Sequence, residues 1–217
     1  MLAEYAVFYE DAFVRVPDYM SYAEAASLPC AAVTAWTALN MHSPLQPGQT
    51  VLVQGTGGVS VFALQLAKLF GARVLAITSS EEKAATLKEL GAGAVVNYST
   101  HPDWDREGVD KLLDIAGEKT IVKSAAATKI GGGIAVVGFA SGFGGGLPPI
   151  DILSGSLRIG GSSIGSRTDV EAMLKAMDMH KLKPVFDRVY PFADFREAYD
   201  RIEAGKQVGK IVIDLTH

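Results

Sequence analysis

Apolar residues along the chain gather in short runs, which alternate with longer segments that have helical spacing. The short runs are rich in β-branched residues and predict buried strands at 51–53, 73–77, 94–97, 112–116, 134–137 and 157–164. Apolar residues three or four positions apart predict helices near 59–70, 81–90, 119–129 and 168–180. Strands that are apolar almost throughout, each followed by a helix, indicate an α/β protein with a doubly wound parallel sheet.

The flanking segments have shorter patterns. Residues 6–8 and 13–16 are expected to be extended, and Ser21 with Glu24 predicts a helix start that continues, after Pro29, through 31–41. Residues 142–149 are rich in glycine and proline and predict a loop. The tail predicts a strand at 185–189, a helix around 195–202 and a final strand at 210–214.

The most informative local pattern follows the first buried strand. Gly55, Thr56, Gly57, Gly58 and Val59 connect that strand to a helix, with Ser60 where a dinucleotide fingerprint has its third glycine. Such a turn places backbone N–H groups and the positive end of a helix dipole at one point, which suits a pyrophosphate and predicts a Rossmann dinucleotide-binding sheet. The alternative is an ordinary tight turn between a strand and a helix.

The end of the second strand predicts which dinucleotide binds. An acidic residue there would bind the ribose 2′-hydroxyl, but this chain has Ser79 and Ser80, followed by Lys83. Hydroxyls and an ammonium group would bind a 2′-phosphate, so the predicted cofactor is NADP(H). Ser79 with Glu82 also matches a capping box, and both interpretations stay open because both use the start of the helix.

Composition limits the classes of partner. The chain has 217 residues, 48% of them hydrophobic, and a net charge of −4, so a nucleic acid or an anionic membrane is not expected as a partner. Cys30 is the only cysteine, which excludes an intrachain disulfide. The sequence shows neither a leader pattern nor a long apolar run, so the expected location is cytoplasmic.

Several longer motifs resemble one superfamily of oxidoreductases. They include SYAEAASLPCAAVTAWTAL, QPGQTVLVQGTGGVSVFALQLAKLFGARVLAITSS, GGGIAVVGFASG and PFADFREAYDRIEAGKQVGKIVIDL. The chain resembles the medium-chain dehydrogenase/reductase superfamily, in particular its zinc-independent quinone-oxidoreductase-like and alcohol-dehydrogenase-like members. This resemblance implies an NADP(H)-dependent oxidoreductase that reduces a small carbonyl, enone or quinone substrate.

The resemblance also implies further cofactor contacts. These are Thr34, Tyr98, Gly138, Phe139, Ala140, Gly165, Ser166 and Arg167. Cys30 stands where zinc-dependent relatives have a metal ligand, but the four histidines show no ligand spacing. We therefore expect no metal, and we expect Cys30 to be a small buried residue. No residue is predicted to be the proton donor.

The resemblance predicts three parts of the chain. Residues 1–20 would be a remnant of a GroES-like catalytic domain, 21–182 the dinucleotide-binding domain, and 183–217 a segment that returns to the catalytic domain. Most of the GroES-like domain is expected to be missing, and the connection from Tyr98 to Gly108 is short. This leaves a second hypothesis, a non-redox or regulatory nucleotide-binding module.

The strand at 157–164 is expected to form a homodimer. In the superfamily that the chain resembles, two such strands pair across a twofold axis. The segment contains no proline and only one charge, Arg158, so it lacks the usual protection of an exposed sheet edge. A proline at Ser162 should then split the dimer. The alternative is a monomer whose edge is covered by residues 142–149 or by the tail.

Overall fold

The computed structural model describes residues 2–3 and 5–215 and is built around a six-stranded parallel sheet. The strands are β1 (Thr50–Gln54), β2 (Arg73–Thr78), β3 (Ala94–Asn97), β4 (Val109–Asp114), β5 (Thr128–Val136) and β6 (Arg158–Gly161). Their order is β3-β2-β1-β4-β5-β6, so the chain reverses direction across the sheet between β1 and β4. The predicted doubly wound sheet is confirmed.

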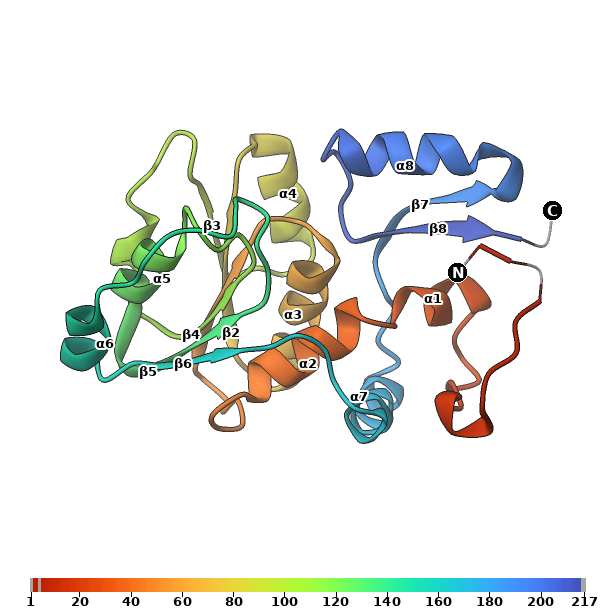
Figure 1. Cartoon of the computed structure of the whole chain (residues 1–217), viewed down its shortest axis with the longest axis horizontal. Coiled ribbons are helices and arrows are strands. Elements are labelled where there is room, and N and C mark those ends of the chain that lie inside the picture. Colours follow the sequence, from red (N-terminus) through yellow and green to blue (C-terminus); the bar gives the residue numbers. More distant parts are fainter. Residues whose placement is uncertain (1, 4, 216–217) are drawn as a thin grey trace.

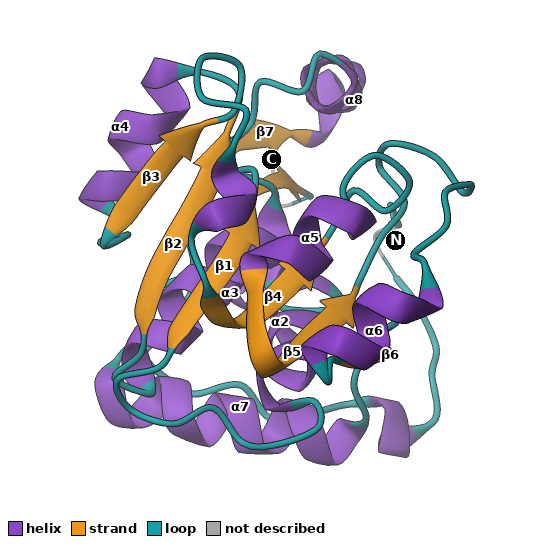
Figure 2. Cartoon of the chain, turned by 90° about the vertical axis from the view of Figure 1, so that its left-hand side faces the viewer, coloured by secondary structure: helices purple, strands orange, loops and turns teal. Residues whose placement is uncertain are grey.

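Helices cover both faces of this sheet. On one face lie α2 (Ala31–Asn40), α3 (Gly58–Leu69), α4 (Glu81–Glu89) and α7 (Arg167–His180), and on the other α5 (Ile121–Ala127) and α6 (Pro149–Gly155). Figure 2 shows α5 and α6 in front of the strands and α2 and α3 behind them. Val51 and Val53 pack toward α2 and α3, whereas Leu52 packs on the opposite face with Trp104. Alternation along one strand therefore supplies both halves of the core.

A second, smaller unit flanks the large sheet. β7 (Phe186–Pro191) and β8 (Lys210–Asp214) form a two-stranded parallel sheet, connected by α8 (Phe195–Glu203). Figure 1 shows this unit beside α1 (Tyr22–Ser27), close to both chain ends. The capping box predicted for α1 is present, because Glu24 N donates to Ser21 Oγ and Ser21 N donates to Glu24 Oε2.

Extended backbone near the N-terminus does not become sheet. Residues 6–8 and 13–16 form no strand, and a short 3₁₀ turn, η1 (Glu10–Ala12), separates them. A strand requires a partner for its backbone groups, and the described chain brings none to this segment. The proposed division into residues 1–20, 21–182 and 183–217 stays a prediction.

The predicted strand at 157–164 was too long. β6 ends at Gly161, although Ser162 N still donates to Val136 O at 2.8 Å. The next two carbonyls turn to α2, because the Thr34 hydroxyl donates to Ser163 O and the Thr37 hydroxyl to Ile164 O. Threonine donors on a neighbouring helix thus end the strand.

Other boundaries also differ from the prediction. The predicted loop at 142–149 is followed by α6, which has no buried residue and so gave no periodic signal. The helix expected at 119–129 is α5 alone, and β5 begins directly after it at Thr128. β4 starts at Val109, earlier than expected, because that residue pairs with Thr128 of β5. Another short turn, η2 (Trp104–Arg106), precedes β4, and η3 (Phe192–Asp194) precedes α8.

No helix among the described residues is long and apolar enough to cross a membrane.

Candidate functional site

The glycine turn lies at the point where the strand order reverses. Gly55 has φ +76°, a conformation that favours glycine, and its N–H donates to Ile77 O at 2.7 Å. Gly57 is the N-cap of α3, and no side chain of the described residues caps the amides of the first turn. A Cβ on Gly57 would meet nothing within 4 Å, so the space beside this glycine is open. A pyrophosphate fits beside Gly57, because the first turn of α3 has no side-chain cap and its helix dipole favours an anion there.

A mostly apolar cavity of about 440 Å³ opens beside this turn. Its walls come from the carboxyl ends of neighbouring strands, where open α/β sheets bind ligands. They include Gln54 at the end of β1 and Gly55 after it, Ile77 in β2, Tyr98 after β3, Ile115 and Ala116 after β4, and Ala140 and Ser141 after β5. Three of the predicted contacts, Gly55, Tyr98 and Ala140, therefore line one cavity.

A buried chain of hydrogen bonds supports the floor of this cavity. Gln54 Nε2 donates to Ser124 Oγ at 3.0 Å, and Ser124 Oγ donates to Asp114 Oδ2 at 2.6 Å. Asp114 Oδ1 also accepts from Gly117 N and the Thr120 hydroxyl. Asp114 thus anchors this network and holds the turn that leads into α5.

The segment between α8 and β8 crosses the glycine turn. The Thr56 hydroxyl donates to Gln207 O, Gly209 N donates to Thr56 O at 2.9 Å, and Gly57 and Gly209 form an isolated β-bridge. The Lys210 side chain passes so close to Gly58 that a Cβ there would lie 2.6 Å from Lys210 Cδ. An ammonium side chain from β8 thus runs across the start of α3. The sequence reasoning missed Lys210, because nothing local to it indicates a phosphate site.

The residues predicted to bind a 2′-phosphate lie together at the end of β2. Ser80, not Ser79, is the N-cap of α4, because Lys83 N donates to Ser80 Oγ at 3.3 Å. The Ser79–Glu82 capping box was therefore wrong by one position. Lys83 Nζ donates to Gly205 O at 2.6 Å, so its ammonium group already has one partner. The first acidic side chain after β2, Glu81, accepts from Asn97.

A second set of predicted contacts lies between α2 and α7, apart from the first cavity. Thr34 is buried and donates to Ser163 O, and a Cβ on Gly165 would collide with Val33 Cγ2. Ser166 is the N-cap of α7, and its hydroxyl donates to Asp169 Oδ2 at 2.6 Å. The hydrogen bonds from the Ser166 hydroxyl and backbone N–H lower the pKa of Asp169. Ser166 thus has a structural partner, in line with a capping role.

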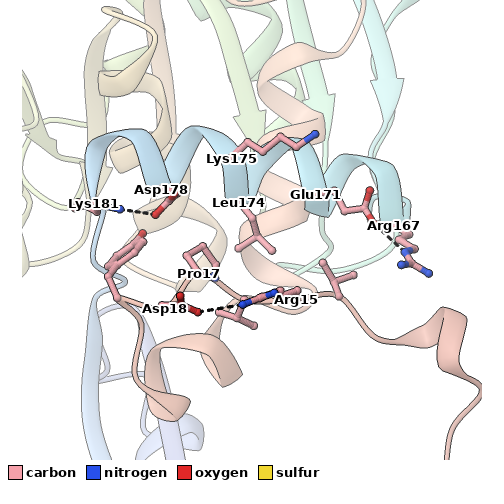
Figure 3. A pocket seen from close by; sticks show the side chains of 12 residues that line it. Arg15, Pro17, Asp18, Arg167, Glu171, Leu174, Lys175, Asp178 and Lys181 are labelled. Carbon is pink, nitrogen blue, oxygen red and sulfur yellow. Dashed lines mark hydrogen bonds and ion pairs between the residues drawn. The ribbon is translucent and has the colours of Figure 1, made fainter.

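Arg167 also has partners outside the glycine turn. Its Nε donates to Glu171 Oε1 at 2.8 Å and its Nη1 to Asp11 O at 3.1 Å. Figure 3 shows Arg167 and Glu171 at one end of a cavity of about 590 Å³, between α7 and residues 14–19. Arg167, together with Gly165 and Ser166, also borders a neighbouring cavity of about 380 Å³. Gly165, Ser166 and Arg167 therefore border a different cavity from the one that Gly55, Tyr98 and Ala140 line.

The end of β5 shows close backbone packing. A Cβ on Gly138 would lie 2.7 Å from Ile115 O, so a larger residue there would displace the β4 loop. Phe139 is half-exposed, and its ring stacks on Phe143 at 5.2 Å between centroids. This close packing gives Gly138 a structural role, and its contact with a cofactor stays a prediction.

Cys30 is not the buried residue that was expected. It is exposed and has φ +64° at the N-cap of α2, because the chain turns there between Pro29 and the helix. It borders the 380 Å³ cavity. Among the described residues, no three His, Cys, Asp or Glu side chains form a group that could hold a metal ion.

Comparisons with known proteins identify the family. The sequence profile of the zinc-binding dehydrogenases matches residues 58–179, more than half of the chain. The chain belongs to this dehydrogenase family. It is 38% identical to a zinc-type alcohol dehydrogenase-like protein of Schizosaccharomyces pombe, a match that covers 98% of this chain and 65% of the relative.

Two solved structures share the fold. A crystal structure of an NAD-dependent alcohol dehydrogenase matches with a TM-score of 0.90 at 38% identity, over 99% of this chain and 65% of that one. The quinone oxidoreductase of Thermus thermophilus, solved also with NADPH, matches with a TM-score of 0.86 at 30% identity, over 99% and 73%. The predicted resemblance to medium-chain dehydrogenases is confirmed. The chain spans slightly less than two thirds of the length of the curated relatives it matches.

Proposed function

We propose that this chain binds a nicotinamide dinucleotide, with NADP(H) preferred, and belongs to an oxidoreductase that reduces a small carbonyl, enone or quinone. One observation carries the proposal: where the strand order reverses, a glycine turn without a side-chain cap leaves open space beside Gly57, next to a mostly apolar cavity. That combination suits a ligand with a pyrophosphate and flat apolar rings.

Each part of the site has a role in this proposal. The first-turn amides of α3 bind the pyrophosphate, and Lys210, which crosses Gly58, adds a positive charge. The cavity between Ile77, Tyr98 and Ala116 takes the adenosine and excludes water from it. The bound nicotinamide would supply the hydride chemistry itself. The chain's own contribution is binding and orientation.

The preference for NADP(H) rests on the end of β2. Ser79 and Ser80 replace the acidic residue that would bind a 2′-hydroxyl and repel a 2′-phosphate. Lys83 would exchange its bond to Gly205 O for the phosphate, a charge-assisted interaction that is the stronger of the two. The relatives include an NAD-dependent enzyme and one solved with NADPH, so these local residues carry the choice.

The proposal is tested by titrating the protein with NADPH and NADH and by following NADPH absorbance with a panel of quinones, enones and aldehydes. We expect binding of both cofactors, tighter binding of NADPH, and consumption with at least one substrate. Binding without consumption would favour the non-redox nucleotide-binding module. Absence of binding for both cofactors would overturn the proposal.

Lys83→Ala tests the cofactor preference. It should weaken NADPH binding by about 1–2 kcal/mol, the scale of a hydrogen bond to a charged group, and leave NADH nearly unchanged. Lys88→Ala is the matched control, because Lys88 lies on the same helix near its other end. Equal losses for both cofactors in calorimetry would contradict the role of Lys83.

A further inference from the structure

Gln54 connects the two strands between which the sheet reverses. It is the last residue of β1 and is only 7% exposed. Its Oε1 accepts from Ile115 N at 3.0 Å and from Ala116 N at 3.4 Å, both in the loop after β4. Its Nε2 donates to Ser124 Oγ on α5. One side-chain amide therefore bridges the crevice between β1 and β4.

The bridge continues through groups that are fully buried. Ser124 and Asp114 are both 0% exposed, and each member of the chain has its hydrogen-bonding partners. A buried polar network in which all groups are satisfied holds its members in one arrangement, because every departure leaves a buried group unpaired. The backbone carbonyl of Gln54 also accepts a hydrogen bond from the Ser60 hydroxyl at 2.6 Å, which connects the first turn of α3 to the same residue.

This geometry lies where the cofactor site needs it. The loops after β1 and β4 lead to helices on opposite faces of the sheet, so they diverge and open the crevice. Gln54, Ile115 and Ala116 all line the 440 Å³ cavity, and Gly55 follows Gln54 directly. An apolar side chain could fill the same volume, but it could not hold two loop amides at fixed positions.

We infer that Gln54 is a positioning residue, which sets the width of the dinucleotide crevice through its bridge to Ile115, Ala116 and Ser124. This inference rests on the proposed function. Gln54 acts on the part of the site that both cofactors would occupy. Its loss therefore weakens the binding of NADPH and NADH alike, whereas the loss of Lys83 weakens only the binding of NADPH. Ser124 and Asp114 act through Gln54.

The test compares Gln54→Met with Gln65→Met. Gln65 is a matched control, because it lies on α3 and its Nε2 donates to a single carbonyl, that of Lys183, at 2.8 Å. Fluorescence titrations are run at a temperature well below the unfolding transitions of both variants. We expect Gln54→Met to lower the affinity for both cofactors at least about tenfold, the equivalent of one lost hydrogen bond. Gln65→Met should bind both cofactors with wild-type affinity.

A reversed pair provides the rescue. Gln54→Glu alone makes two carboxylates compete for one hydroxyl proton, and Asp114→Asn alone leaves that proton without an acceptor. In the double variant the Ser124 hydroxyl donates to the introduced carboxylate and accepts from the introduced amide, so the chain of bonds runs in the opposite direction with the same total charge. We expect the double variant to bind NADPH more tightly than Gln54→Glu.

Ser124→Ala replaces Gln54→Met if the latter fails to fold, because it removes the hydrogen bond that holds the Gln54 amide in its orientation, with a smaller change in volume. Wild-type affinity in these variants, or a rescue of thermal stability in the double variant without any rescue of affinity, would overturn the inference. A wild-type protein that binds neither cofactor would instead overturn the proposed function. The two failures are thus distinguishable.

Discussion

Both sheets of this protein are parallel, yet their burial differs sharply. In β1, Val51, Leu52 and Val53 have no exposed surface, and the same holds for Leu112 and Leu113 in β4. In the two-stranded sheet only Tyr190 and Val212 are buried. The flanking unit also exposes apolar side chains of α8, with Tyr199 at 57% and Ile202 at 51%.

The difference shows what a parallel sheet needs. Parallel strands are stable where both faces are covered, and the six-stranded sheet receives helices from its own chain on each face. The two-stranded sheet has one crossover helix, α8, and its neighbour α1, while the aromatic side chains of Tyr5 and Tyr9 stay in solvent. Its contact with the larger unit includes the hydrogen bond and bridge at the glycine turn, so position and stability of the small sheet depend on that contact.

Hydrogen exchange should give the largest contrast between the two sheets. Amides of β1 and β4 should exchange only when the whole protein unfolds, whereas those of β7 and β8 should exchange through local opening that costs at least about 3 kcal/mol less. Mass spectrometry of exchanged peptides measures the difference. Equal protection in both sheets would show that they unfold as one unit and would remove the comparison.

Gly57→Val tests the place where the two units meet. A Cβ there meets no protein atom within 4 Å, so the fold should persist, but a valine side chain fills the space proposed for the pyrophosphate. We expect cofactor affinity to fall at least about hundredfold. Gly146→Val is the control, because a Cβ on Gly146 also meets nothing within 4 Å. Retained affinity with a native circular dichroism spectrum would count against the site.

The open edge of the large sheet is expected to pair with a second copy through β6. Ser162→Pro, the substitution that the sequence suggested, does not test this, because Ser162 N–H donates inward to Val136 O. Neighbouring residues of a strand alternate in direction, so Gly161 N–H points away from β5. Gly161→Pro should therefore convert a dimer into a monomer in sedimentation at micromolar concentration. A monomeric wild type would end the proposal.

Lys111 makes the stability of the large sheet depend on pH. Its ammonium group is buried and donates to the carbonyls of Leu39, Met41 and Ser43 at the end of α2. Burial lowers the pKa of Lys111 from 10.5 to about 8, and the charge of Arg158 adds to this. Between those values the unfolded chain binds more protons than the folded one, so stability should rise as the pH increases from about 8 to 10.5.

Lys111→Met should remove the rise in stability between about pH 8 and 10.5. It should also lower the free energy of unfolding at pH 7 by about 1–3 kcal/mol, because buried carbonyls lose their donor. Urea unfolding at pH 7 and pH 10 measures both effects. Lys123→Met is the control, since Lys123 donates to Pro102 O at an exposed position. An unchanged pH dependence in Lys111→Met would show that another group titrates.

The sequence by itself determined the features that depend on neighbouring residues. The apolar runs and helical spacings predicted every strand of both sheets, and the glycines at 55, 57 and 58 predicted the turn, because such patterns need only the local chain. The confirmed superfamily rests on the same local motifs. Small errors, such as a capping residue at Ser79 instead of Ser80, reflect how similar adjacent serines are as caps.

Only the tertiary structure decided which distant groups meet. Thr56 bonds to Gln207 across 151 residues, Lys210 crosses Gly58, and Lys83 bonds to Gly205, and no local pattern contains these pairs. Arg167 turned to Glu171 and Asp11, and Cys30 became exposed, because helix packing fixes the direction of a side chain. The Gln54 bridge arises in the same way. Its partners follow a different strand, and the two strands become neighbours only when the sheet forms.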